Sequence, residues 1–315
     1  MYYLRGLFVS LSVLVLLYAI VSLLVGCAWR RLLPPAQHLA PSRAANAMYA
    51  LRTSPLWLSV AVVLGFSVPS FLCYEPRASG EALGAIPVLL SVVFGALVAV
   101  GAARAWNAHA RTRRLVRQWL RETCLIETRA GVEILRGAAD APLVALAGIT
   151  RPALVISESA SASLTPQELS RTVAHELAHQ RAHDNLKKLL LLACFPRMAA
   201  FEAVWREVVE FSADTAAVHS ESEALDLASA LVKISRLSGG SPLPELASSL
   251  VEGPSSLLEA RVQRLIEWRV APRVAASFST RAQWIAFVTF AAAGLTAAYP
   301  SLLRAAHAIT EFLVR

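Results

Sequence analysis

Two histidines four residues apart, with a glutamate directly after the first, form the pattern in this sequence best suited to chemistry. They lie in the segment His175-Glu-Leu-Ala-His179. Residues four apart lie on one face of a helix, so both imidazoles would converge on one point and could bind one metal ion there. Glu176 would reach a water molecule at that ion without binding the ion itself. The pattern predicts His175 and His179 as metal ligands and Glu176 as the catalytic base; the alternative is a helix with two ordinary surface histidines.

A pair of carboxylates further along the chain would complete this site. Glu210 and Asp214 are four residues apart, in a stretch that favours a second helix beginning near Phe201. Two histidines and one glutamate, with a fourth position left open, are a usual ligand set of catalytic zinc, so Glu210 is the predicted third ligand. Asp214 would accept a hydrogen bond from a ligating histidine and fix its tautomer. We therefore expect one zinc ion per chain; the alternative is that both acids only solvate a helix face.

Other polar residues near these motifs are candidates for supporting roles. Asp184 would hold a histidine ring or balance the charge of the lysines that follow it. His219 and Arg261 are candidates for stabilising the oxyanion of the reaction, with a surface or salt-bridge role as the alternative for each. His183 continues the face of the two histidines but lies a turn too far to bind the same ion, so we expect it to face solvent.

The residues ahead of the histidine pair indicate how its helix is positioned. Thr165 would be the N-cap, Pro166 fits the first helical position, and Glu168 would complete a capping box. Pro152–Ile156 predicts a strand just before this helix. We expect that strand to pair with an extended substrate, which would bind through its main chain.

The composition indicates a membrane protein. Of the 315 residues, 56% are hydrophobic and 17% are charged, with a mean hydropathy of +0.52. Soluble proteins have about 45–50% hydrophobic and about 25% charged residues. These values exclude a disordered chain, a coiled coil and a disulfide scaffold; the four cysteines follow no paired spacing either. Four apolar runs are long enough to cross a bilayer as helices, namely Leu7–Ala28, Leu56–Cys73, Leu83–Ala103 and Trp284–Leu302. A cleaved signal peptide is the alternative for the first run, but Arg30 and Arg31 directly after it argue against that.

Arginines beside these runs predict the orientation. The loop after the first run and the segment after the third are rich in arginine, and the positive-inside rule places both in the cytoplasm. Both termini would then lie outside. The same arginines account for the net charge of +8, so we expect contact with the lipid bilayer and no direct binding of nucleic acid. Because none of the four runs has an ionisable residue near its middle, a transporter or channel is disfavoured.

The spans also predict the domain organisation. Residues 1–106 would form three transmembrane helices, 107–281 a cytoplasmic domain with its own core, and 282–315 the fourth helix with a short tail. Cys124–Thr128 and Val132–Leu135 predict a hairpin of strands in that domain. The expected fold class is therefore mainly α and membrane-bound, with four transmembrane helices and an inserted cytoplasmic α+β domain.

Several motifs of this chain occur together in one known family. They are Arg151-Pro-Ala-Leu-Val-Ile, Leu164-Thr-Pro-Gln-Glu-Leu, Val173-Ala-His-Glu-Leu-Ala-His, Asp184-Asn, Glu210-Phe-Ser-Ala-Asp and Glu259-Ala-Arg-Val-Gln-Arg-Leu. Through these motifs, residues 140 to 270 resemble the BlaR/MecR-type integral-membrane zinc metallopeptidases, which are gluzincins. HtpX-type and CAAX-prenyl proteases share the two-histidine helix and the Glu-x-x-Ala-Asp element, so these two motifs identify the gluzincin clan better than the branch.

The resemblance implies a zinc metalloendopeptidase in the bacterial inner membrane, with its catalytic domain on the cytoplasmic side. Its substrate would be a protein or peptide, such as a transcriptional repressor or a membrane protein, cleaved in regulatory proteolysis. The alternatives are quality control of membrane proteins, as in HtpX-type proteases, and a signalling module that binds a partner without turnover. Two departures stand out: a penicillin-binding sensor domain is expected to be absent, and Ala213 stands where the family often has cysteine, as on the HtpX side.

Overall fold

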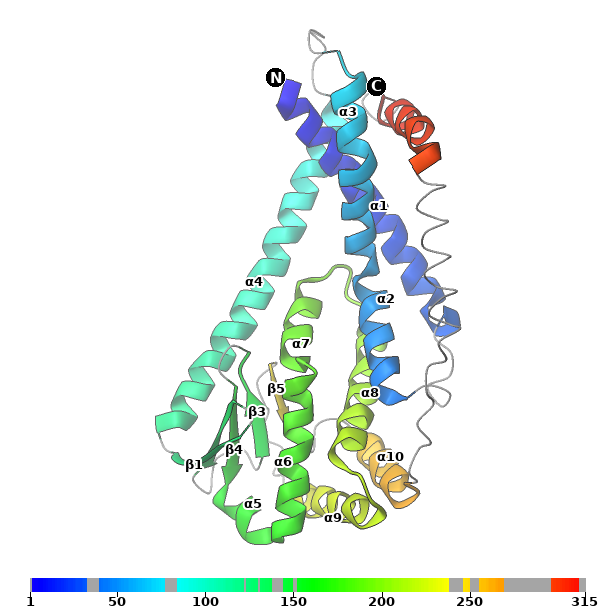
Figure 1. The fold of residues 1–315 in the computed structure, drawn as a ribbon. Coiled ribbons are helices and arrows are strands. Elements are labelled where there is room, and N and C mark those ends of the chain that lie inside the picture. Colours follow the sequence, from blue (N-terminus) through cyan, green and yellow to red (C-terminus); the bar gives the residue numbers. More distant parts are fainter. Residues whose placement is uncertain are drawn as a thin grey trace. The chain divides into compact units, whose positions relative to one another are not determined.

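The computed structural model describes most of the chain and divides it into two compact units. The described residues are 2–32, 40–76, 84–121, 123–129, 131–137, 144–149, 152–237, 246–249, 255–268 and 296–311. Within them the chain is mostly helical, with one small mixed sheet (Figure 1). The first unit comprises described residues of Met1–Cys27, Thr53–Ala99 and Ala271–Arg315, and the second comprises those of Ala28–Arg52 and Val100–Val270. The predicted boundaries at 106/107 and 281/282 stay predictions.

Three helical stretches in the described part are long and apolar enough to cross a membrane, namely Tyr2–Arg31, Pro41–Tyr74 and Ala85–Trp119. They correspond to α1 (Tyr2–Leu32), to α2 (Pro41–Val62) continued by the π-helical η2 (Val63–Ser67) and α3 (Val68–Tyr74), and to α4 (Ala85–Arg121). The first two predicted spans fall within the first two stretches, and the third, Leu83–Ala103, coincides with the third stretch from Ala85 onward. The predicted fourth span, Trp284–Leu302, lies mostly outside the described residues, where a helix is described only over 296–311.

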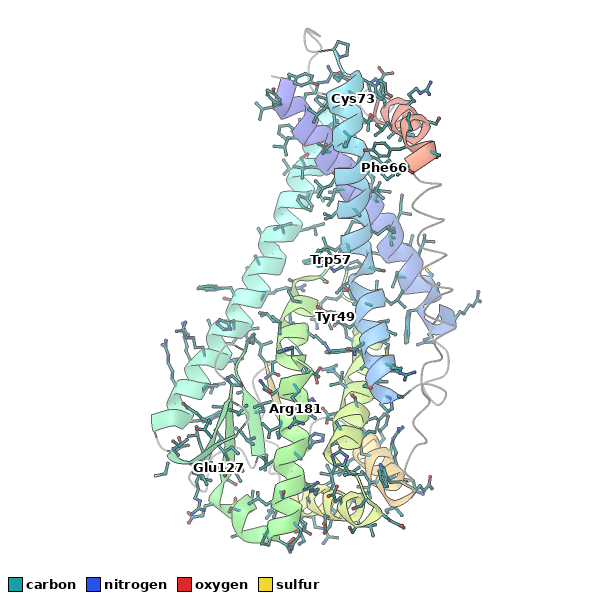
Figure 2. The ribbon with its side chains drawn as sticks, in the orientation of Figure 1. Tyr49, Trp57, Phe66, Cys73, Glu127 and Arg181 are labelled. Carbon is teal, nitrogen blue, oxygen red and sulfur yellow. The ribbon has the colours of Figure 1, made fainter. Side chains whose placement is uncertain are left out.

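Small polar side chains connect the helices of the first unit. Ser12 Oγ donates to the carbonyl of Pro87 at 3.1 Å, and Ser70 Oγ donates to the carbonyl of Leu303 at 3.0 Å. Such bonds join apolar helices without exposing backbone groups, since the helical backbone keeps its own hydrogen bonds. Large apolar side chains of this unit stay exposed, for example Trp57, which is labelled in Figure 2.

The second unit contains a sheet whose strands follow the order β1-β2-β4-β3-β5. The strands are β1 (Cys124–Arg129), β2 (Val132–Gly137), β3 (Val144–Ala147), β4 (Ala153–Ser157) and β5 (Ala247–Ser249). β1 and β2 form the predicted antiparallel hairpin, and Gly131 at its turn has a φ of 76°, which glycine adopts at little cost. β2 pairs with β4 in parallel, and β3 pairs with both β4 and β5 in antiparallel fashion.

The position of β4 contradicts one expectation from the sequence. The strand at Pro152–Ile156 was expected to pair with an extended substrate, but β4 lies between β2 and β3. Val155 is paired with Leu135 on one side and with Ala145 on the other. Its main-chain groups are therefore committed to the sheet, and that prediction is wrong. The sequence could not reveal this, because a short apolar strand has the same residue pattern in the middle of a sheet as at its edge.

Helices cover this sheet and carry the predicted site. They are α5 (Glu158–Ser163), α6 (Pro166–Arg181), α7 (Asp184–Ala193), α8 (Ala199–Ala217), α9 (Glu221–Leu237) and α10 (Ser255–Ile266). The largest core cluster joins strand residues such as Leu154 to Leu177 of α6 and Leu231 of α9, each at most 2% exposed. α6 packs against both α8 and α9, and α10 packs against α8 and α9.

A second core cluster ties residues 28–52 to α7 and α8. Met48 of α2 is 3% exposed and packs with Phe201 and Trp205 of α8 and with Leu191 of α7. The indole N–H of Trp205 donates to the carbonyl of Ala45 at 3.2 Å. The end of α1 and the first turns of α2 therefore belong to the same folded unit as the two-histidine helix.

Candidate metal centre

The capping box predicted for α6 forms as expected. The backbone N–H of Glu168 donates to Thr165 Oγ1 at 3.3 Å, and the backbone N–H of Thr165 donates to Glu168 Oε2 at 2.8 Å. Glu168 also accepts hydrogen bonds from Ser229 Oγ and Lys233 Nζ of α9, at 2.6 and 2.8 Å. Burial raises the pKa of Glu168, but Lys233 and these hydrogen bonds lower it to about 2. The carboxylate thus anchors the first turn of α6 to α9 and fixes the rotation of the helix.

The two histidines of α6 converge with Glu210 of α8. His175 Nε2 lies 3.2 Å from His179 Nε2, and these two nitrogens lie 3.5 and 3.6 Å from the carboxylate oxygens of Glu210. All three ligand atoms lie within 4.8 Å of one another, and all three residues are buried. α6 and α8 are packed together, as Figure 1 shows, and Arg181, labelled in Figure 2, marks the C-terminal end of α6 just past His179.

A carboxylate holds the other ring nitrogen of each histidine. His175 Nδ1 lies 3.0 Å from Asp214 Oδ1, and His179 Nδ1 lies 2.9 Å from Asp184 Oδ2. The Asp184 carboxylate can only accept, so His179 Nδ1 carries the proton of their hydrogen bond and His179 Nε2 faces the Glu210 carboxylate. Asp214 lies at ion-pair distance from His175 Nδ1, and Arg261 Nη2 lies 3.4 Å from His175 Nε2. Two nitrogen lone pairs and a carboxylate oxygen facing one point repel one another unless a cation lies between them. The donor set therefore fits a metal ion.

Buried charge leads to the same conclusion. Four acids of this group are almost completely buried, with Glu176 0%, Asp184 3%, Glu210 5% and Asp214 2% exposed. Arg261, which is 1% exposed, contributes one positive charge among them. Burying an excess of negative charge is costly, and a divalent cation removes most of that cost.

Arg261 of α10 is bound directly to this group. Its Nε and Nη2 donate to the two carboxylate oxygens of Asp214 at 2.8 and 2.7 Å, and its Nη1 lies 3.0 Å from Glu210 Oε2. The bidentate pairing fixes the Asp214 carboxylate in the plane of the guanidinium. Arg261 was a candidate for stabilising the oxyanion, but its guanidinium is engaged by Asp214 and Glu210. The geometry favours a role in positioning those two carboxylates.

The electrostatic environment keeps the acids ionised. Burial raises the pKa of Glu210, but Arg261 and the two histidines lower it to about 2. Burial also raises the pKa of Asp214, but Arg261 and His175 lower it well below its usual range. Burial lowers the pKa of His175, but Asp214 and Glu210 raise it to about 9. The site therefore attracts positive charge strongly, and a proton on His175 would compete with a metal ion for the same nitrogen.

The remaining predicted residues differ in where they lie. Glu176 is fully buried, and its charge is one of those that raise the pKa of Arg261. His183 is exposed, as expected. His219 is also exposed, and its backbone N–H donates to Glu223 Oε2 at 2.7 Å. No contact found among the described residues joins His219 to the histidine pair.

Sequence reasoning missed how Arg261 and Lys233 contribute. Arg261 contacts Asp214 across 47 residues of sequence, and Lys233 contacts Glu168 across 65. Neither pair has a spacing that points to a contact, because only neighbours within a turn or two are readable from periodicity. One signal could have indicated that Arg261 is buried: it lies on an apolar face of its helix. Its neighbours along that face, Leu257 and Leu265, are buried too.

Comparison with known families adds independent support. The family model described as BlaR1 peptidase M56 matches residues 17–265, from within α1 to the end of α10. A search among curated proteins found no match to the chain. The matched range includes all three candidate membrane helices, at least in part, together with His175, His179, Glu210 and Arg261.

Proposed function

Because the chain belongs to the BlaR1 peptidase M56 family, we propose that it is a zinc-dependent endopeptidase held in a membrane. A peptidase acts on a protein or peptide substrate, and the three apolar helices contact lipid. One observation carries the proposal: the convergence of two imidazole nitrogens and the Glu210 carboxylate beside the buried Glu176. The proposed ligands are His175, His179 and Glu210, for one zinc ion per chain, which is the usual set in a catalytic site.

The chain's own residues would divide the chemistry between them. A zinc ion bound there supplies a Lewis acid that polarises the scissile carbonyl and lowers the pKa of water. Glu176 takes a proton from the attacking water and passes it to the leaving amine, as a general base and then a general acid. Asp184 would keep the proton of His179 on Nδ1 through their hydrogen bond, and Asp214, 3.0 Å from His175 Nδ1, would do the same for His175, so that each Nε2 could bind the ion.

Arg261 is a positioning residue in this proposal. It keeps Asp214 and Glu210 ionised and oriented through its hydrogen bonds and ion pair. His219 stays a candidate for stabilising the oxyanion, a role that requires a hydrogen-bond donor close to the reacting carbonyl.

We place the peptidase unit on the cytoplasmic side of the bacterial inner membrane, with both termini outside. The arginine distribution supports this orientation, and so does the second core cluster. Residues 28–52 and 100–270 fold together in one unit, which supports placing both on the same side of the membrane. The positive-inside rule assigned both to the cytoplasm on other grounds.

The proposed role is regulatory proteolysis of a transcriptional repressor or a membrane protein. Quality control of membrane proteins is the second candidate, favoured by Ala213, which stands where the BlaR/MecR-type family often has cysteine. A non-catalytic signalling module is disfavoured, because such a module has no need for a buried base at Glu176.

Glu176→Gln tests the activity directly. The variant should bind zinc like the wild type and lose cleavage, because glutamine keeps the shape but cannot accept the proton. Proteomics of cleaved peptides in cells expressing either form would identify substrates. The matched control is Glu207→Gln, an acid on α8 outside the histidine group. Full proteolysis by the Glu176→Gln protein would contradict the proposed mechanism.

A further inference from the structure

The connection between α7 and α8 forms an apolar tip on the second unit. Residues 190–201, here called the α7–α8 tip, comprise the last turn of α7, the connection itself and the first residues of α8. Of these twelve residues, eleven are uncharged, and Arg197 is the exception. Leu190 is 45% exposed, and Pro196 is exposed as well. Exposed apolar surface is unfavourable in water, so the composition of the tip suits contact with an apolar medium.

α4 contacts the tip where its own apolar run ends. The run Leu83–Ala103 includes Gly101 and is followed directly by Arg104. A Cβ at Gly101 would lie 2.5 Å from the carbonyl oxygen of Ala193, so the two backbones are close there. The guanidinium of Arg104 lies 4.8 Å from the centroid of the Phe195 ring, which is a cation–π contact. The tip is thus level with the last turn of this apolar run.

α2 and α1 also contact the tip at the ends of their apolar runs. Arg52 lies four residues before the second predicted run, and its Nη2 donates to the carbonyl of Pro196 at 2.7 Å. Trp29 directly follows the first run, and its ring centroid lies 5.1 Å from that of Phe201. All of these residues belong to the second unit. Tryptophan and arginine are typical of the boundary between hydrocarbon and headgroups, so three helices independently place the tip at that boundary.

We propose that the α7–α8 tip is inserted in the membrane leaflet that adjoins the second unit, with acyl chains around Leu190 and lipid headgroups around Arg197. Burying the leucine surface among acyl chains is favourable, and the long arginine side chain reaches the headgroup phosphates. The insertion requires that α1, α2 and α4 cross a membrane, and it does not depend on peptidase activity. α7 has 10 residues and is roughly 15 Å long. Because Asp184 at its other end lies 2.9 Å from His179, the inserted tip would hold the metal centre about one helix length from the bilayer surface.

The experiment uses the full chain in lipid nanodiscs, with its four native cysteines replaced by serine. A single cysteine is introduced as Leu190→Cys and labelled with an environment-sensitive fluorophore. Lipids brominated on their acyl chains quench the fluorophore only where they touch it. Leu89→Cys, in the apolar run of α4, is the lipid reference, and Leu225→Cys, an exposed leucine of α9, is the matched control. Quenching at Leu190→Cys should be within about 2-fold of Leu89→Cys and about 5-fold or more above Leu225→Cys.

A charge at the same position gives a second readout. Leu190 and Leu225 are exposed to a similar extent, 45% and 48%, so in water Leu190→Asp and Leu225→Asp would have similar effects. An aspartate among acyl chains is costly, so in nanodiscs Leu190→Asp should lower the thermal midpoint by roughly 5 °C more than Leu225→Asp. Zinc content shows whether Leu190→Asp still folds; if it does not, the quenching of Leu190→Cys decides alone.

Quenching at Leu190→Cys no stronger than at Leu225→Cys overturns the insertion. The rate of reaction with a charged maleimide then shows what surrounds Leu190 instead. A rate equal to that of Leu225→Cys means that water surrounds the tip, and a much lower rate means that another protein surface, such as a second copy of the chain, covers it. Neither measurement uses cleavage, so a failure of the proposed peptidase function would leave this test intact.

Discussion

At the scale of single residues, the candidate centre depends on carboxylates that orient histidines. Asp214 and Asp184 each lie about one hydrogen bond from a ring nitrogen, at 3.0 and 2.9 Å. Each is therefore placed to influence which nitrogen of its histidine faces the metal position. Such partners usually affect metal affinity strongly without being ligands themselves.

Asp214→Ala and Asp184→Ala should each lower zinc affinity by roughly 10–100-fold, because the histidine loses the acceptor that fixes its tautomer. Competition with a chromogenic chelator measures the affinity. Asp226→Ala, an acid on α9 outside the site, is the control and should leave it unchanged. Unchanged zinc affinity in both aspartate variants would contradict the orienting role and leave Asp214 and Asp184 as ordinary ion-pair partners.

Arg261→Met should weaken zinc binding and destabilise the second unit by about 3–5 kcal/mol, since it leaves Asp214 and Glu210 buried without their cation. Arg261→Lys keeps the charge but not the two-pronged geometry, and should restore part of both losses. Thermal unfolding and zinc affinity are the two readouts. Arg264→Met, an exposed arginine on the same helix, is the control. If Arg261→Lys behaved like Arg261→Met, geometry rather than charge would dominate.

At the scale of elements, the site is produced by the way α6, α8 and α10 are held together. The Glu168 carboxylate ties the start of α6 to α9, and residues 28–52 brace α8 from another side. A helix displaced by one residue would move its ligands by about 1.5 Å, enough to separate them from a shared ion. The anchors of these helices are thus as important for the site as the ligands.

Stability should fall in acid partly through Glu168. Its pKa is about 2 in the folded protein against an ordinary value of 4.5, so its contribution is present above about pH 4.5 and is lost as the pH falls towards 2. Glu168→Gln should therefore lower the thermal midpoint at pH 7, and the difference from the wild type should shrink between pH 4.5 and 2. Glu158→Gln, an exposed acid on α5, is the control. A difference that stayed constant with pH would mean that the charge of Glu168 is not what stabilises α6.

Gly101 marks a close approach between α4 and the end of α7. A Cβ at Gly101 would lie 2.5 Å from the carbonyl oxygen of Ala193, whereas a Cβ at Gly95 on the same helix would meet nothing within 4 Å. Gly101→Ala should destabilise the second unit by about 1–3 kcal/mol, because the two backbones must separate. Gly95→Ala should be neutral or slightly stabilising. The thermal midpoints of both variants measure this difference. Equal midpoints would mean that α4 and α7 can separate at this contact without loss of stability.

At the scale of the whole molecule, the chain combines apolar helices with a second unit that holds the candidate metal centre and whose core includes residues from the first two of those helices. The family match from 17 to 265 covers both parts. A fragment beginning at residue 100 would lack Met48 and Ala45 and would expose Trp205 and Phe201. Its core would lose the burial of two large aromatic side chains.

The fragment 100–270 should therefore bind zinc poorly and aggregate, while the full chain in nanodiscs stays soluble and loaded. Size-exclusion chromatography and zinc content compare the two. In the full chain, Met48→Asp should cause a similar loss of zinc, because it places a charge in the cluster that supports α8. A monomeric, zinc-loaded fragment would show that residues 28–52 are dispensable for the site.

The sequence by itself determined the features that depend on local periodicity. The capping box, the His175–His179 spacing, the β1–β2 hairpin and the first three apolar runs all follow from residues within a turn or a strand of one another. The convergence of Glu210 with the histidines was also predictable, since two histidine ligands alone do not complete a metal site.

Tertiary structure decided everything that depends on contacts between distant segments. Only the fold shows that β4 is enclosed by β2 and β3, that Arg261 is bound by Asp214 and Glu210, and that residues 28–52 support α8. The side chains in these contacts are ordinary in type and lie tens of residues apart. Their effect arises from burial and from charges brought within 3 Å, and no spacing in a linear chain encodes that proximity.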